Sequence, residues 1–146
     1  RADGRLDEKT LGRLAARAEG LGLTLHRAFD LVPDLSEAIE TAVVLGFERI
    51  LTSGGARRAA DGVETLERTI ALADGRISIM PGAGIDPDNA AALVARLGVR
   101  EVHASCGRTV APIDEKILDL GFDTSARRVT DREMVAALKA VLAASP

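Results

Sequence analysis

The sequence predicts an α/β fold of parallel βα units, of the kind that builds a TIM (β/α)8-type barrel. Four apolar segments of strand length are separated by segments with helical periodicity: Leu23–His26, Arg49–Thr52, Ile77–Met80 and Glu101–Ala104. They start about every 25 residues, and strands that alternate with helices indicate a parallel sheet. A closed barrel needs about 250 residues. We therefore expect a half barrel of about four βα units that lacks its N-terminal strands, with a four-stranded open sheet as the alternative.

A helix is predicted before the first strand, because apolar residues recur there at intervals of three and four. Its apolar face consists of Leu11, Leu14, Ala15, Ala18 and Leu21. Gly20 and Gly22 end this helix.

The second helix follows the first strand and has a clear start signal. Asp34 is the expected N-cap and Glu37 the residue that reaches back to it. Gly46 ends this helix. Its apolar stripe is Leu35, Ala38, Ile39, Ala42 and Val43.

The third and fourth helices follow the second and third strands. Val63, Leu66 and Ile70 mark the third, which closes near Asp74 and Gly75. Asp86 and Pro87 open the fourth, since proline suits the first helical position. The fourth helix carries Leu93, Val94 and Leu97 and stops at Gly98.

The last part of the chain departs from the βα pattern. Residues Gly107–Arg128 form a connection longer than a usual βα loop, with a short helix expected at Ile113–Leu120. A capping box, Thr130-Asp131-Arg132-Glu133, opens a final helix. The inward residues of that helix are Met134, Leu138, Val141 and Leu142.

Composition limits the class of protein. The 146 residues suit one domain, 1–146, with 47% hydrophobic and 28% charged residues. A net charge of −3 argues against nucleic acid as a partner, and no apolar run approaches the about 18 residues that span a membrane. The single cysteine, Cys106, favours a reducing cytoplasm. Because the chain begins with Arg1 in a loop-like stretch, we expect a fragment or a processed product.

Candidate functional residues lie where the strands end, because loop amides and helix N-termini converge there. His26, Arg27 and Asp30 follow the first strand and are the first candidates for catalysis. A histidine titrates near neutral pH, an arginine holds a carboxylate or phosphate, and an aspartate orients either of them. The alternative is an Arg27–Asp30 ion pair that only pins the loop.

Glycine-rich loops after the second and third strands are candidates for binding an anion. The residues are Thr52, Ser53, Gly54 and Gly55 after the second strand and Gly82, Ala83 and Gly84 after the third. Hydroxyl groups and closely approaching amides can hold an oxyanion. The alternative is a plain turn. Arg57-Arg58 and Arg127-Arg128 are more typical of solvated surface.

Alternation divides the fourth strand between two faces. Glu101, His103 and Ser105 are expected in the barrel interior, with His103 a further catalytic candidate and Ser105 a ligand-binding one. Cys106 is expected on the opposite face, under the helices. His26 and His103 form at most a weak metal signal, and the metal ligands stay unknown.

The strand ends, in their order and spacing, resemble the CutC copper homeostasis family over about residues 3–105. The matching segments are Asp3–Asp7, Leu23–Asp30, Arg49–Gly55, Ile79–Ile85 and Glu101–Ser105. The resemblance implies the C-terminal half of a TIM barrel, a cytoplasmic location and a role in copper homeostasis, with copper as the implied ligand. It also implies copper-linked cysteines in the first half of the barrel, which this sequence lacks. The family loop is usually Gly-Gly-Gly, so Ala83 is a departure that costs about 1 kcal/mol if its φ is positive.

Three functions remain open. The first is copper handling, for which Cys106, Met80, Met134 and the two histidines are poor Cu(I) donors. The second is a barrel enzyme that acts on a small anionic or phosphorylated metabolite. Its anion is expected in the loops after the last two strands, with Arg27 on a second anionic group and His26 or His103 as the acid–base group. The third is a non-functional fragment, a half barrel whose open edges self-associate, as a homo-oligomer or by pairing with another half barrel.

Overall fold

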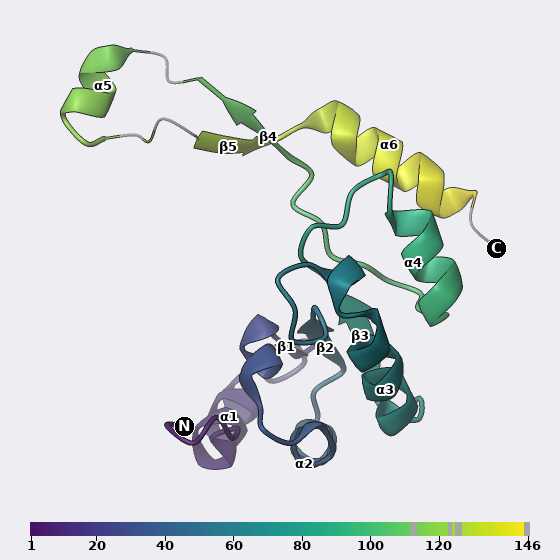
Figure 1. Ribbon diagram of the computed structural model, residues 1–146. Coiled ribbons are helices and arrows are strands. Elements are labelled where there is room, and N and C mark those ends of the chain that lie inside the picture. Colours follow the sequence, from purple (N-terminus) through teal and green to yellow (C-terminus); the bar gives the residue numbers. More distant parts are fainter. Residues whose placement is uncertain (112–113, 123, 125–126, 145–146) are drawn as a thin grey trace.

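The computed structural model describes residues 1–111, 114–122, 124 and 127–144, and its body is an open α/β layer (Figure 1). Three parallel strands form the sheet, in the order β1-β2-β3: β1 Thr24–Leu25, β2 Arg49–Thr52 and β3 Ser78–Pro81. Ile50 of β2 is level with Leu25 on one side and Ile79 on the other. The predicted parallel βα units are confirmed, although the strands within the described part of the chain do not close a barrel.

The fourth predicted strand, Glu101–Ala104, is wrong. This segment makes one isolated parallel bridge, His103 with Gly82, through a bond of 2.8 Å from the His103 amide to the Pro81 carbonyl. Only β3 borders this segment within the described residues, and a strand with a neighbour on one side gains half of the possible ladder bonds. The chain then turns away at Cys106, whose φ is 44°.

The helices form largely where the sequence predicted them. Their bounds are α1 Glu8–Arg17, η1 Arg27–Leu31, α2 Leu35–Val44, η2 Ala59–Asp61, α3 Val63–Ala73, α4 Ala90–Leu97 and α6 Arg132–Ala143, where η denotes a 3-10 helix. Asp34 caps α2 by accepting from the Glu37 amide at 3.1 Å, which confirms the expected N-cap. The Glu37 carboxylate instead contacts Arg5.

Two helix starts differ from the prediction. The fourth helix begins at Ala90, not at Pro87, because the Asp86 carboxylate accepts from the amides of Asp88 and Asn89 and holds residues 87–89 as a turn. The last helix is capped by Asp131, not by Thr130. Asp131 accepts from two amides of the first turn and also pairs with Arg108, whereas Thr130 belongs to a strand.

Two apolar clusters form the core. The first lies between the sheet and helices α1 and α2 and is centred on Phe29, Ile39 and Ile50. The second lies between α3, α4 and α6; it contains Leu66, Leu93, Cys106 and Leu138, with Val102 and Ala104 packed against it. The predicted outer face of segment 101–106 is therefore confirmed, since Val102, Ala104 and Cys106 all belong to this side.

The predicted apolar face of the first helix is only partly covered. Leu11 packs on the first cluster, but Leu14 and Leu21 are 60% and 74% exposed. Beyond α1 no further sheet is present among the described residues, so this face has nothing to pack against.

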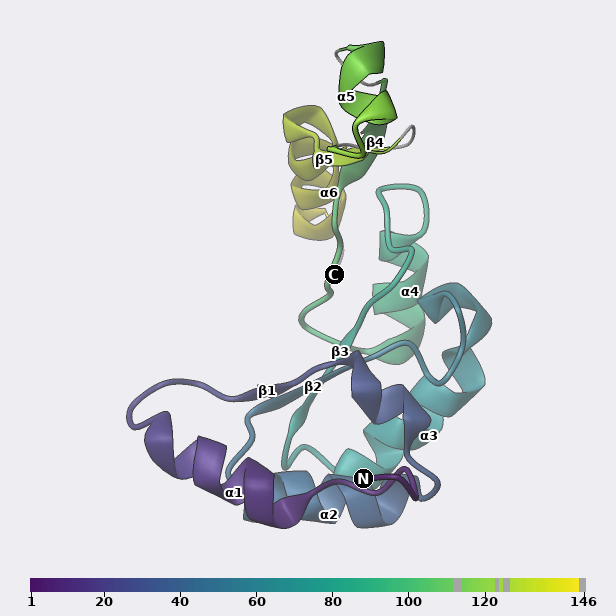
Figure 2. The ribbon, with the colours of Figure 1, turned by 90° about the vertical axis from the view of Figure 1, so that its left-hand side faces the viewer.

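An arm projects from the body between Cys106 and Asp131 (Figures 1 and 2). It consists of β4 Gly107–Val110 and β5 Arg127–Thr130, which pair antiparallel, with α5 Glu115–Asp119 near its tip. The sequence predicted a loop with a short helix at Ile113–Leu120; residue 113 lies outside the described residues, and the helix is shorter. The ribbon was missed because its strands are largely polar and do not alternate.

Candidate functional site

The carboxyl ends of β1, β2 and β3 meet at one edge of the sheet, which we call the rim. The rim consists of η1, the loop 53–58 after β2 and the loop 82–85 after β3. Because the strands are parallel and in register, the sequence-predicted residues His26, Arg27, Ser53 and Gly82 share this edge. The expectation that these residues gather at one end of the sheet is confirmed.

Asp30 is the centre of a hydrogen-bond network at the rim. Its carboxylate accepts from the Thr52 hydroxyl at 2.5 Å, the Ser53 amide at 3.0 Å and the Gly55 amide at 3.1 Å. The Ser53 hydroxyl lies 2.9 Å from the same carboxylate. The donors that the sequence assigned to an external anion are therefore largely engaged by an anion of the chain itself, and the Gly54 amide donates to the Thr52 hydroxyl instead.

Arg27 closes this network from the solvent side. Its Nε donates to Asp30 at 2.9 Å, and its Nη2 donates to the Ser53 hydroxyl at 2.5 Å and to the Ala56 carbonyl at 3.1 Å. The Arg27 side chain is 40% exposed and that of Asp30 only 9%. The ion pair thus pins η1 to the loop after β2.

The environment of Asp30 keeps its carboxyl ionised. Burial raises its pKa, but hydrogen bonds from Thr52, Gly55 and Ser53 lower it by more, so the pKa of Asp30 lies below its ordinary value. A carboxylate held in this form by fixed donors is suited to a structural role.

The two histidines lie on opposite sides of the sheet. His26 follows β1, and His103 bridges to the far side of β3. Three strand spacings of about 4.8 Å separate them by about 14 Å, too far to share one metal ion. Nδ1 of His26 accepts from the Ala28 amide at 3.0 Å, which leaves Nε2 as the nitrogen that faces solvent.

In the described part of the chain, the side chains that could bind copper do not gather at one place. Within residues 1–111, 114–122, 124 and 127–144 there is no group of three His, Cys, Asp or Glu side chains that could hold a metal. Cys106 is buried in the second apolar cluster. The described residues therefore do not fit a copper site of their own.

The loop 82–85 differs from the loop after β2 because its amides are not engaged. Ala83 and Gly84 both have positive φ, 83° and 67°. Their carbonyls accept from the Ala59 amide and the Asn89 side chain, which fixes the loop. Among the described residues, the amides of Gly84 and Ile85 donate to no other group. Successive amides in such a conformation form a concave anion-binding nest.

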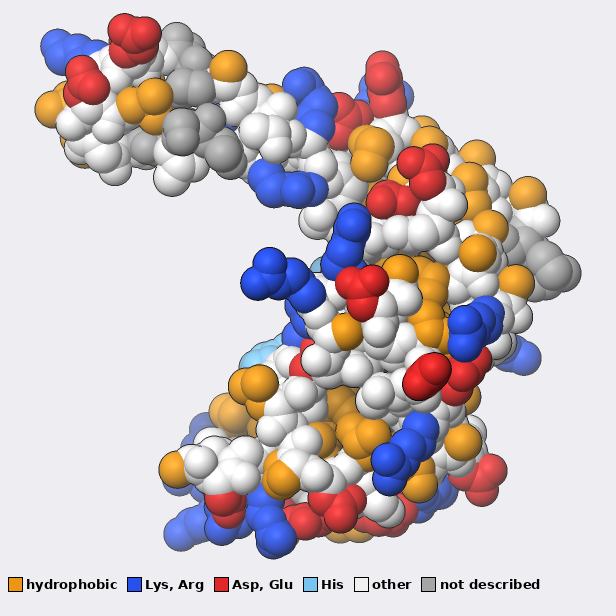
Figure 3. Space-filling view, in the orientation of Figure 1, with side chains coloured by type: hydrophobic (Ala, Val, Ile, Leu, Met, Phe, Trp, Pro, Cys, Tyr) orange, Lys and Arg blue, Asp and Glu red, His pale blue; other side chains and the backbone are white. Residues whose placement is uncertain are grey.

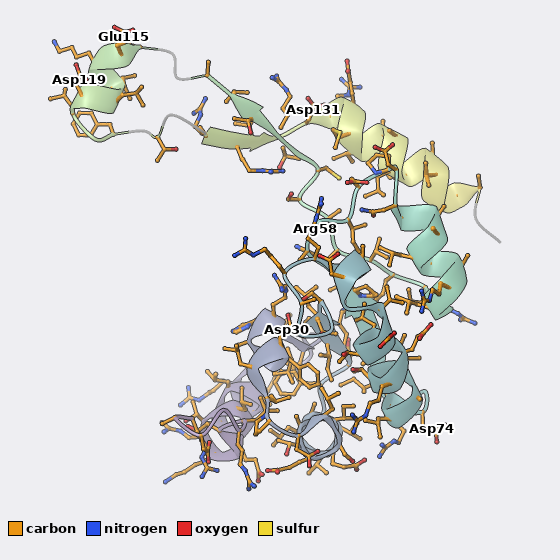
Figure 4. The ribbon with its side chains drawn as sticks, in the orientation of Figure 1. Asp30, Arg58, Asp74, Glu115, Asp119 and Asp131 are labelled. Atoms are coloured by element: carbon orange, nitrogen blue, oxygen red, sulfur yellow. The ribbon has the colours of Figure 1, made fainter. Side chains whose placement is uncertain are left out.

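Arg58 lies directly over this loop. A Cβ added at Gly84 would come within 2.7 Å of the Arg58 Nε, so the guanidinium stem packs on the glycine. Figure 4 places Arg58 on the concave side of the molecule, between the body and the arm. The sequence favoured a solvated surface for Arg57-Arg58, and both residues are exposed. The signal that would have identified the site is the third-strand loop, whose glycine leaves room for a side chain.

Glu101 lies at the opposite end of the sheet from the rim. Glu101 pairs with Arg49 at 2.9 Å and accepts from the Ser78 hydroxyl, at the amino ends of β2 and β3. The Ser78 bond, followed by the Arg49 pair, lowers the pKa of Glu101 against the effect of burial. His103 is therefore not satisfied by Glu101, and both His103 and Ser105 are exposed.

Parallel βα units with polar loops at the carboxyl ends of the strands define an α/β protein of the TIM-barrel type, here with an open sheet. The chain belongs to the CutC family, because the CutC family model matches residues 1–108. The predicted resemblance is thereby confirmed.

Sequence matches to members of this family cover nearly all of the chain. A CutC family protein of Sinorhizobium medicae is 56% identical over 97% of the chain, and one of Caulobacter vibrioides is 52% identical over 97%. The chain spans 58% and 59% of these two relatives.

A solved CutC structure from Streptococcus agalactiae, a protein given copper homeostasis as a provisional role, superposes with a TM-score of 0.66. It is 29% identical, and the match covers 70% of this chain and 50% of that one.

No helix within the described ranges is long and apolar enough to cross a membrane.

Proposed function

We propose that this chain forms the C-terminal half of a CutC-type (β/α)8 barrel, as one domain over residues 1–146, and that its rim binds a small anionic ligand. The observation that carries the proposal is Arg58 lying over the loop 82–85, whose Gly84 and Ile85 amides are not engaged. A phosphate or carboxylate group is the chemical class that such donors take.

Charge supports this choice of ligand. Neither Arg57 nor Arg58 forms an ion pair within residues 1–111, 114–122, 124 and 127–144, in contrast to Arg27, Arg49, Arg76 and Arg96. Figure 3 shows Lys and Arg side chains, in blue, lining the hollow between the body and the arm. An unpaired guanidinium at a concave surface attracts anions at long range.

Backbone strain supports the same location. Alanine pays for a left-handed φ, and strained residues that persist are concentrated at ligand-binding loops. Ala83 holds a φ of 83° one residue before the amides that we assign to the anion.

Within this proposal the remaining rim residues have distinct roles. Arg27 and Asp30 hold the loop after β2 in place, and with Thr52, Ser53, Gly54 and Gly55 they form a fixed wall of the site. His26, through Nε2, is the acid–base group if the whole protein is an enzyme. His103 and Ser105 face the interior that the missing half of the barrel would enclose.

Phosphate titration tests the proposal. We expect amide signals of Gly84 and Ile85 to shift on addition of inorganic phosphate in 1H–15N NMR spectra, and Arg58→Gln to weaken binding about tenfold. Arg68→Gln is the control, because Arg68 is exposed on α3, away from the rim. Equal shifts in wild type and Arg58→Gln would contradict the proposal.

Copper homeostasis is the second candidate function, favoured by the provisional role of the Streptococcus agalactiae relative. Since the described residues do not form a copper site, copper would be cargo that also needs donors beyond this chain. Cu(I) titration against a competing chelator tests this. Affinity that falls when His26, His103 or Cys106 is replaced would support a site here, and unchanged affinity would count against it. A cytoplasmic location belongs to the same proposal, since Cu(I) and a free thiol persist in a reducing compartment.

A further inference from the structure

The arm ends in an apolar tip that the chain itself leaves uncovered. Leu120 and Phe122 are 57% and 78% exposed. Ile117 and Leu118, on α5, are only half-buried, and neither core cluster contains a residue of the tip. Large exposed apolar side chains gathered at one place are typical of an interaction surface.

The arm has little stability of its own. An isolated two-stranded ribbon is marginal in water, and a five-residue helix lies far below the length at which helices persist alone. At the base of the ribbon, Arg108 pairs with Asp131. A surface that covers the tip would therefore stabilise the whole arm.

The tip is acidic as well as apolar. Residues 114–122 contain three carboxylates, Asp114, Glu115 and Asp119, and one cation, Lys116, which gives a formal charge of −2. Figure 4 shows Glu115 and Asp119 at the far end of the arm. The complementary charge lies on the loop 53–58, where Arg57 is exposed and has no ion pair within the described part of the chain.

The described residues at the tip of the arm do not contact this loop of their own body. Figures 1 and 2 show that the ribbon carries α5 away from the sheet, and Figure 3 shows the hollow between the arm and the body. A second copy of the chain, however, offers the same basic loop to the tip. A two-fold axis would make the exchange reciprocal, so both tips and both loops are covered.

We propose that the arm of one chain docks on the rim of a second copy, with its carboxylates beside Arg57 and Phe122 against the loop 53–58. The partner then contributes acidic residues to the edge of the rim. This interface is distinct from pairing through open strand edges, and it does not depend on the phosphate proposal.

Sedimentation of the whole chain tests the apolar part of the interface. We expect Phe122→Ser to weaken self-association about tenfold or more. Val44→Ser is the matched control, because Val44 is 81% exposed on α2, and it should leave the dissociation constant unchanged. A monomeric wild type, or equal weakening by both variants, would overturn the proposal.

A charge exchange tests where the tip docks. Arg57→Glu and Asp119→Arg should each weaken association, and the two changes together should restore it, since the pair then has reversed charges. Restoration would support contact between the tip and the loop 53–58. Additive weakening, or association that none of these variants affects, would show that chains pair elsewhere, as through strand edges, and would refute the proposal.

Discussion

The loops after β2 and β3 occupy equivalent positions but differ in what their donors bind. In the loop after β2, the Asp30 carboxylate accepts from the amides of Ser53 and Gly55. In the loop after β3, the amides of Gly84 and Ile85 donate to no described residue, and Arg58 lies above them. Both loops are rich in glycine, so composition does not distinguish a closed anion site from an open one. What distinguishes them is whether another group of the chain accepts hydrogen bonds from their amides.

Replacing Asp30 should break the first loop and leave the second intact. We expect Asp30→Asn to lower the free energy of unfolding by about 3 kcal/mol, because the buried residues Thr52 and Ser53, and the Gly55 amide, lose a charged acceptor. Urea unfolding measures this, with Asp34→Asn as the control, since asparagine caps a helix as well as aspartate does. A loss below about 0.5 kcal/mol would mean that the network contributes little.

Acid should weaken the hydrogen-bond network of Asp30 as the Asp30→Asn substitution does. The folded-state pKa of Asp30 lies below its ordinary value of 3.8, so its contribution is complete above that pH. As the pH falls below 3.8 the unfolded state takes up the proton first, and this stability is lost. The difference in unfolding free energy between wild type and Asp30→Asn should therefore narrow in acid. A constant difference down to pH 2.5 would contradict the pKa assignment.

A methyl group at Gly84 should separate stability from binding. We expect Gly84→Ala to cost about 1 kcal/mol for its positive φ and also to weaken phosphate binding, because the new Cβ displaces Arg58. Gly55 also has a positive φ, but a Cβ added there would lie 3.9 Å from its nearest neighbour, the Asp30 carbonyl oxygen. Gly55→Ala should lose stability alone. Equal phosphate affinity in the two variants would argue against Arg58 as the anion clamp.

Removing the methyl group of Ala83 should give the smallest effect. Glycine relieves the left-handed strain at a φ of 83° but gains freedom in the unfolded chain, so Ala83→Gly should stabilise by about 0.5 kcal/mol. Thermal unfolding measures this. A destabilised variant would show that the alanine methyl group makes a contact worth more than its strain.

Local patterns predicted the body of the fold well. β2 lies exactly at the predicted residues 49–52, and the Asp34 cap, the Gly98 stop and the outward side of Cys106 follow from spacing and parity. Segment 101–104 satisfied the same pattern but lacks a neighbour on its outer side, which no local pattern can reveal. The arm was missed because its strands pair with each other and not with the core.

The candidate site was predicted in position but not in detail. Strand ends located the rim because parallel strands end together. The Arg27–Asp30 ion pair was the alternative that the sequence offered for these residues, and it is present. The bonds that Asp30 accepts from Thr52 and Gly55 could not be predicted, since they join residues 22 and 25 positions apart. Arg58 was assigned to the surface because only the folded chain shows Gly84 beneath it.

Cys106 offers a chemical probe of how part of the fold opens. It is the chain's single thiol and is buried within the second apolar cluster, and its carbonyl accepts from the Asp131 amide at 2.8 Å. We expect a thiol reagent to react with this sulfur when the cluster opens, because Cys106 is 8% exposed and lies in the same cluster as Leu93 of α4 and Leu138 of α6. The labelling rate would therefore report the opening of the second apolar cluster separately from the unfolding of the first cluster, around Ile50.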